Sequence, residues 1–123
     1  MNIIGRGERV CLQILSEWFP SAEFNIQTPL SNLVDKSWGF SERQEKETLD
    51  ITYKLNDKIY VVRIQDPHHD GIGMQRVDRV QRVTLEYHDY TVIDVWYNDC
   101  PNLFKDVYDD ISIGELKDVY KDN

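Results

Sequence analysis

The sequence predicts an α/β fold, in which helices flank a mixed β-sheet in the order α–β–β–β–α–β–α. Two observations lead to this prediction. Residues 49–55 and 59–65 alternate apolar and polar side chains on either side of a short polar turn, as the two strands of a β-hairpin do. A helical pattern over 74–88 then precedes a β-rich run at 91–96, and this order favours a crossover between parallel strands.

Length and composition limit the class of protein. With 123 residues, of which 41% are hydrophobic, we expect residues 1–123 to form a single domain with one core. No apolar run approaches the roughly 20 residues of a membrane span, and we expect no signal peptide and no membrane partner. The two cysteines, Cys11 and Cys100, indicate a reducing, cytoplasmic compartment and no disulfide. A net charge of −8 argues against a protein that coats nucleic acid through charge alone.

The first element is a helix, predicted over residues 6–19 and ended by Pro20. Its apolar stripe at i, i+4 spacing consists of Val10, Ile14 and Trp18, with Cys11 and Leu15 beside them. Glu8 lies in the first turn, where a carboxylate either favours the helix dipole or serves a functional site. Residues 22–27 follow as a short predicted strand.

The hairpin then places a polar cluster at one of its ends. Its apolar faces match when the numbers of opposed residues sum to 113 or 115, which sets Asp50 across from Arg63 or from Gln65. In either register, Asp50 is expected to share a sheet face with both. The segment Asp66-Pro67-His68-His69 follows directly, so we look for function at this end of the hairpin.

The helix predicted over 74–88 carries two stripes. The stripe expected to be buried consists of Val77, Val80, Thr84 and Tyr87, with Val83 alongside. The second stripe is Arg76, Arg79 and Arg82 at i, i+3 spacing, which suits either phosphate contacts or ion pairs with surface carboxylates.

The last elements follow the strand at 91–96. Cys100 and Pro101 begin a short helix through about Tyr108. The sequence Ser112-Ile-Gly-Glu115 resembles a capping box and is expected to open a final helix.

With its predicted elements and motifs in this order, the chain resembles the PD-(D/E)xK nuclease superfamily. The resemblance is greatest to the branch of very-short-patch-repair-type endonucleases and small restriction-endonuclease-like domains. That branch has a glutamate in the first helix, an aspartate in the hairpin, a strand similar to Glu-x-Asp-Gly-x-x-His, and a helix followed by a strand that ends in tryptophan. The corresponding positions here are Glu8, Asp50, 62–69, Asp78, Arg82, Leu85 and 89–96. Arg63 and Gln65 depart from the pattern, because Arg63 stands where a metal-binding glutamate is expected and Gln65 replaces the usual aspartate or lysine.

The resemblance implies a restriction-endonuclease-like core that cleaves or nicks DNA with Mg²⁺ or Mn²⁺. Asp50, Gln65 and Glu8 would hold the metal, and His69 would be the general base. The residues implied to contact the DNA backbone are Lys54, Arg76, Arg79 and Arg82. The net charge of −8 is compatible with this activity, since acidic residues and a cation would act together. Whether the chain acts alone or as a homodimer is left open.

Two other classes remain open. One is a nuclease-fold domain that has lost catalysis and binds DNA or protein, which Arg63 favours. The other is an acidic interaction protein, such as an inhibitor that mimics nucleic acid, which the charge and the acidic residues of 106–122 favour. A mimic should carry carboxylates over a broad exposed face, whereas a nuclease should gather its predicted catalytic residues in one cleft.

Overall fold

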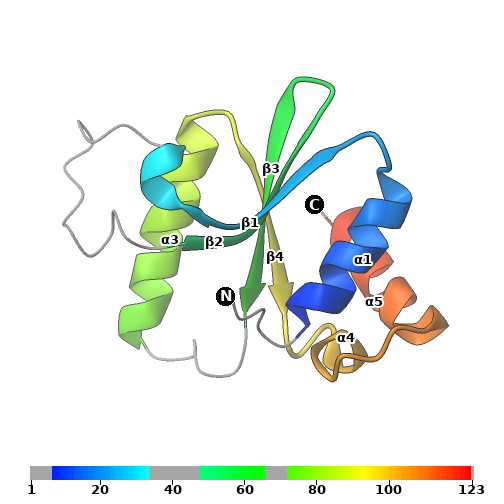
Figure 1. Ribbon diagram of the computed structural model, residues 1–123. Coiled ribbons are helices and arrows are strands. Elements are labelled where there is room, and N and C mark those ends of the chain that lie inside the picture. The colour runs from blue at the N-terminus through cyan, green and yellow to red at the C-terminus, as the bar shows by residue number, and fades with distance from the viewer. Residues whose placement is uncertain (1–6, 34–47, 66–71, 123) are drawn as a thin grey trace.

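The computed structural model describes residues 7–33, 48–65 and 72–122. Helices cover both faces of a mixed four-stranded sheet with strand order β1-β2-β3-β4 (Figure 1). The strands are β1 (Glu23–Pro29), β2 (Thr48–Leu55), β3 (Lys58–Gln65) and β4 (Thr91–Trp96). The helices are α1 (Glu8–Trp18), α3 (Ile72–Tyr87), α4 (Pro101–Phe104) and α5 (Asp110–Lys121), with a 3₁₀ turn, η1 (Leu30–Asn32), after β1. The predicted α/β class with a mixed sheet is confirmed, and the order of elements in the described residues agrees with the prediction as far as β4, after which two helices follow.

The central hairpin forms in the first of the two predicted registers. Ile51 lies opposite Val62 and Tyr53 opposite Tyr60, so the opposed residue numbers sum to 113. The connecting residues Asn56 and Asp57 both have positive φ, 51° and 65°, as a two-residue hairpin turn requires. On its other side β3 pairs in parallel with β4, and α3 makes the crossover between them, as predicted.

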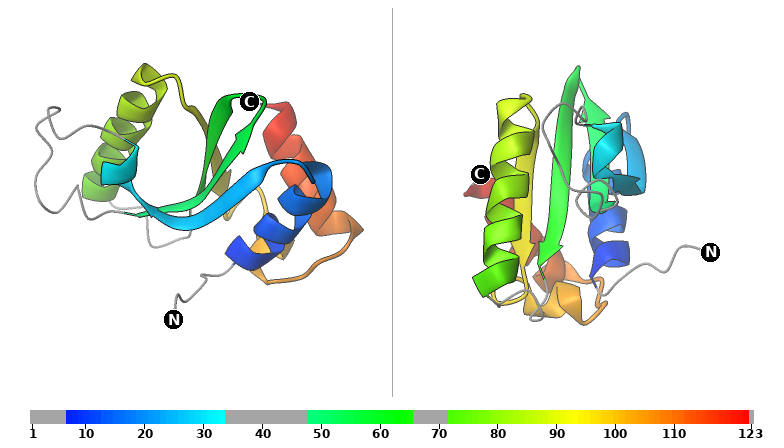
Figure 2. Two further views of the ribbon diagram at one scale, coloured as in Figure 1. Left: turned by 45° about the horizontal axis from the view of Figure 1, so that its top comes forward. Right: turned by 90° about the vertical axis from the view of Figure 1, so that its left-hand side faces the viewer.

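The main core lies between the sheet and the layer of α1, α4 and α5 (Figure 2). It confirms both the apolar stripe of the first helix and the apolar face of the hairpin. Its buried residues include Val10, Cys11, Ile14, Leu15, Ile51, Tyr53, Val62, Ile93, Val95, Cys100 and Leu103. Both cysteines are buried and neither forms a disulfide.

A second, smaller core lies between the sheet and α3. It consists of Leu30, Leu49, Val61, Leu85 and Val92. The prediction of which stripe of α3 is buried is wrong. Among the members of that stripe whose side chains are described, only Thr84 is buried, whereas Val80, Val83 and Tyr87 are exposed. The helix instead turns the face that carries Leu85 and Gln81 toward the sheet, where Arg63 needs polar partners.

The C-terminal helices differ from expectation at their ends. Helix α4 stops at Phe104 instead of continuing to about Tyr108. Helix α5 begins almost a turn early, because Asp109 and Ser112 form its capping box. Glu115, expected in that box, instead accepts hydrogen bonds from the backbone N–H groups of Asn102 and Leu103, which would otherwise lack partners at the start of α4. None of the helices in the described part of the chain is both long and apolar enough to cross a membrane.

Candidate functional site

A buried ion pair joins β3 to β4, the parallel pair of strands. Arg63 of β3 and Asp94 of β4 are partners in the strand register. The arginine Nε donates to Oδ1 at 2.6 Å and Nη2 donates to Oδ2 at 2.9 Å, a bidentate arrangement. The two side chains are only 7% and 9% exposed, so each charge depends on the other for compensation.

Three further side chains complete what we term the Asp94 cluster. Gln65 Nε2 donates to Asp94 Oδ1 at 3.2 Å, and Arg82 of α3 donates to Oδ2. Gln81, also on α3, accepts from Arg63 Nη1 at 3.1 Å. Burial acts to raise the pKa of Asp94, but the hydrogen bonds and charges of Arg63, together with Gln65 and Arg82, outweigh it and hold that pKa below its ordinary value. The cluster fastens α3 to the sheet.

Sequence reasoning missed Asp94, although the sequence contains a signal for it. Asp94 is a single charge in the β-rich run Val92–Trp96, and Arg63 is a single charge in the apolar run Val61–Ile64. Two such strands in parallel pairing can bring opposite charges together, since an isolated charge in a buried strand requires a partner.

Two further carboxylates, Glu8 and Asp50, accept hydrogen bonds from groups of the sheet. Glu8, the first residue of α1, is buried and accepts a hydrogen bond from Gln27 Nε2 at 3.1 Å. Asp50 Oδ2 accepts from the backbone N–H of Ile64 at 2.7 Å. Burial raises the pKa of the Cys11 thiol, and the charges of Cys100, Asp50 and Glu8 raise it further. Gln27, which donates to Glu8, lies between Ile26 and Thr28, and these two residues pair with Ile51 and Leu49 on either side of Asp50.

The regular alternation of side chains in β2 breaks at Asp50. Leu49 packs in the core under α3, whereas Ile51 packs in the core under α1, although residues two apart normally share a sheet face. Gln27 of β1, between the residues that pair with Ile51 and Leu49, has a φ of 53°, so the neighbouring strand is distorted at the same level. The expectation that Asp50 shares a sheet face with Arg63 and Gln65 is therefore not met.

The predicted catalytic residues with described side chains therefore do not all lie in one site. Glu8 is linked through Gln27 to the part of β1 that pairs with β2 around Asp50. The side chain of Gln65 belongs to the Asp94 cluster instead. His69 lies outside the described residues. Among the residues that the structure describes, no group of three or more His, Cys, Asp or Glu side chains is placed to hold a metal ion.

The predicted DNA-contacting residues also differ from one another in their surroundings. Lys54 on β2 and Arg79 on α3 are exposed to solvent. Arg82 is instead engaged in ion pairs with Asp94 and Glu86, as the alternative interpretation of this stripe expected. The side chain of Arg76 is not among those described.

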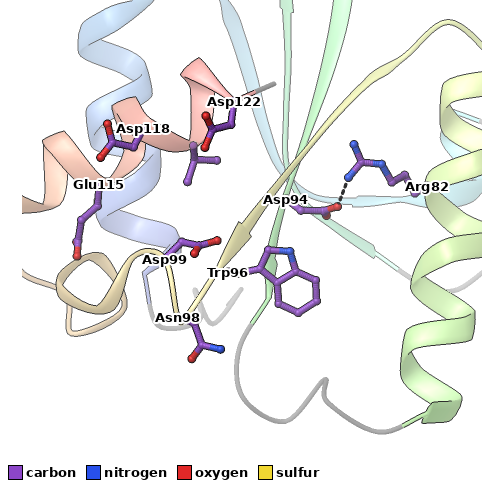
Figure 3. A pocket seen from close by; sticks show the side chains of 9 residues that line it. Arg82, Asp94, Trp96, Asn98, Asp99, Glu115, Asp118 and Asp122 are labelled. Carbon is purple, nitrogen blue, oxygen red and sulfur yellow. Dashed lines mark hydrogen bonds and ion pairs between the residues drawn. The ribbon is translucent and has the colours of Figure 1, made fainter.

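A pocket of about 530 Å³ lies beside β4, between the Asp94 cluster and α5 (Figure 3). Its wall is strongly acidic. The carboxylates that line it are Asp94, Asp99, Glu115, Asp118 and Asp122. Other lining residues are Arg82, Trp96 and Asn98. Such a wall attracts cationic groups and repels phosphates.

Comparisons with models of known protein families, with curated proteins and with solved structures give no match to the chain. The functional proposal therefore depends on the residues of the chain itself.

Proposed function

We propose that the domain has a restriction-endonuclease-like core and is a metal-dependent DNA endonuclease with a reduced metal site. Gln27 lies in β1 between the residues that pair with the two neighbours of Asp50, and it donates a hydrogen bond to Glu8. The observation that carries this proposal is this link between Glu8 and Asp50. They come from the first helix and from the hairpin, the two elements that supply such carboxylates in the superfamily that the chain resembles. The mixed sheet with flanking helices is compatible with such a core.

The donor set suits a hard divalent cation. Mg²⁺ and Mn²⁺ prefer oxygen ligands, often one or two carboxylates with water and substrate phosphate, so Glu8 and Asp50 would hold the ion. When bound, such an ion activates water and offsets charge on the phosphate. The Gln27 amide and the Ile64 N–H group orient these two carboxylates.

The two other predicted catalytic residues, Gln65 and His69, have different places in the proposal. The side chain of Gln65 is left out of the metal site, since it donates to Asp94. His69 remains the proposed general base, and a histidine is suited to this role because its ordinary pKa lies near neutrality.

The arrangement of Arg63 also favours the proposal. An arginine that paired with Asp50 would compete with a cation for that carboxylate. Here the guanidinium group makes two hydrogen bonds to Asp94, which compensates its charge on the α3 side of the sheet.

The proposal is tested by incubating the purified chain with supercoiled plasmid and with oligonucleotides, in Mg²⁺, in Mn²⁺ or in EDTA. We expect nicking or cleavage with either metal and none in EDTA. A chain that cuts no DNA in either metal is not a nuclease of this type. Cleavage that persists in EDTA would equally rule out a metal-dependent mechanism.

The acidic pocket favours a second candidate, a catalytically inactive nuclease-fold domain that binds a basic protein segment. This function predicts no cleavage in any metal and salt-sensitive binding of an arginine-rich peptide. Reversing two exposed pocket charges, Asp118→Lys with Asp122→Lys, should abolish that binding, whereas Asp57→Lys at the hairpin turn should preserve it. Isothermal titration calorimetry distinguishes these outcomes.

A further inference from the structure

The outer face of α3 exposes a regular apolar stripe. Val80, Val83 and Tyr87 are 43%, 60% and 73% exposed, whereas Leu85 on the opposite side of the helix is fully buried. The intervals of three and four residues correspond to positions a, d and a of a heptad, the spacing with which one helix packs along another. Adjacent exposed apolar side chains of this kind are typical of an interaction surface.

Two opposite charges flank this stripe on the same side. Arg79 directly precedes Val80, and Glu86 directly precedes Tyr87, so both occupy position g of the heptad. In an antiparallel helix pair, g residues face g residues of the other helix, and charges there set partner and orientation. Arg79 of one copy would therefore meet Glu86 of a second copy, and the same contact would form again by symmetry.

We propose that this face of α3 binds a second copy of the chain in an antiparallel, two-fold symmetric contact centred near Val83. Self-complementarity is the property that a two-fold interface requires, and the Arg79 and Glu86 charges supply it. A single helix pair buries less than the roughly 1,200 Å² of standard stable interfaces, so the dimer should be weak. This inference is independent of the proposed nuclease function.

Analytical ultracentrifugation of the full chain from about 1 µM to about 1 mM tests the proposal, a range that covers weak association. We expect a reversible monomer–dimer equilibrium that Val83→Glu abolishes, because it places two carboxylates at the two-fold axis. Ile111→Glu is the matched control, since Ile111 of α5 is also 60% exposed and lies outside the stripe. It should leave the equilibrium unchanged. Urea unfolding of each variant separates lost association from lost folding.

Charge exchange then tests the antiparallel orientation. Arg79→Glu and Glu86→Arg should each weaken self-association at least about tenfold, because each places like charges across the contact. Glu86→Arg also removes the ion pair with Arg82 within the chain, so neither variant alone is decisive. An equimolar mixture of the two variants is decisive, because its mixed dimer restores both opposite-charge contacts and should associate as tightly as wild type.

Three results would overturn the proposal. These are a wild type that is monomeric over the whole range, a dimer that Val83→Glu leaves intact, and a failure of the mixed variants to associate. A monomeric wild type would assign this face to another protein or to another segment of the same chain. None of these results would affect the nuclease proposal, which the DNA cleavage assay tests separately.

Discussion

Arg63 and Asp94 lie directly opposite each other in the parallel β3–β4 pair and make two hydrogen bonds, at 2.6 and 2.9 Å, inside the protein. Around them, Gln65, Gln81 and Arg82 complete a polar centre between the sheet and α3. A buried ion pair adds little stability relative to a well-packed apolar pair, but it is costly to break on one side. The Asp94 cluster should therefore control stability and the position of α3.

Asp94→Ala should destabilise the protein by about 3–5 kcal/mol, because it leaves the buried Arg63 charge without its main partner. The double variant Arg63→Met with Asp94→Leu should lose much less, since no buried charge remains at this pair. Urea unfolding measures both, with the exposed Asp99→Ala as control. A single variant as stable as that control would show that the pair is not structurally important.

The Arg63–Asp94 ion pair also changes the result that we expect from the substitution Arg63→Glu. The sequence alone suggests that this substitution restores the acidic metal ligand of the superfamily. In the structure, residue 63 lies opposite Asp94, so a glutamate there would face another buried carboxylate. We expect Arg63→Glu to unfold at a lower urea concentration than wild type, and added Mg²⁺ should not restore the midpoint. Full recovery with Mg²⁺ would contradict this expectation.

The low pKa of Asp94 predicts a pH dependence of stability. A carboxyl group whose pKa is lower in the folded than in the unfolded state binds fewer protons when folded, so its stabilising effect is complete above the unfolded value of about 3.8. This effect is lost as the pH falls through the folded pKa. Urea unfolding of wild type and Asp94→Asn should therefore differ by a constant free energy from about pH 5 to 7 and begin to converge only as the pH falls below about 4. Convergence already above pH 5 would contradict this assignment.

The sequence predicted those parts of the fold that depend on local patterns. Matching the apolar faces of the hairpin limited its register to two choices, and the Asn56-Asp57 turn adopts one of them. The rotation of α3 was not predictable in this way, because its valines suggested a buried stripe. The need of Arg63 and Asp94 for polar partners turned Gln81 and Arg82 toward the sheet instead.

The candidate site was predictable only in part, for a similar reason. Strand alternation placed Asp50 with Arg63 and Gln65, but that alternation breaks where Leu49 and Ile51 enter different cores. A break of this kind depends on contacts between β1, β2 and η1 that no local pattern reveals. The prediction that Glu8 and Asp50 belong to one site came from the resemblance to nucleases and not from periodicity.

Two glycines should respond in opposite directions to substitution by alanine. Gly7, just before α1, has a φ of 80°, and a Cβ there would lie 3.0 Å from Leu103 Cδ2, so Gly7→Ala should destabilise by about 1–2 kcal/mol or more. Gly114 lies inside α5 with no atom within 4 Å of an added Cβ, so Gly114→Ala should stabilise by about 0.5–1 kcal/mol. Thermal unfolding measures both. Equal effects would contradict the positive φ assigned to Gly7.

Asp50 belongs to the proposed metal-dependent nuclease site. Nicking of supercoiled plasmid in Mg²⁺ by Asp50→Asn, compared with Asp57→Asn, tests this assignment most directly. Both variants change one hairpin carboxylate to an amide, but Asp57 lies in the exposed turn. We predict that Asp57→Asn nicks DNA as wild type does and that Asp50→Asn, folded as judged by its urea transition, is slower by at least about 100-fold. Equal nicking by Asp50→Asn and wild type would show that Asp50 does not take part in nicking.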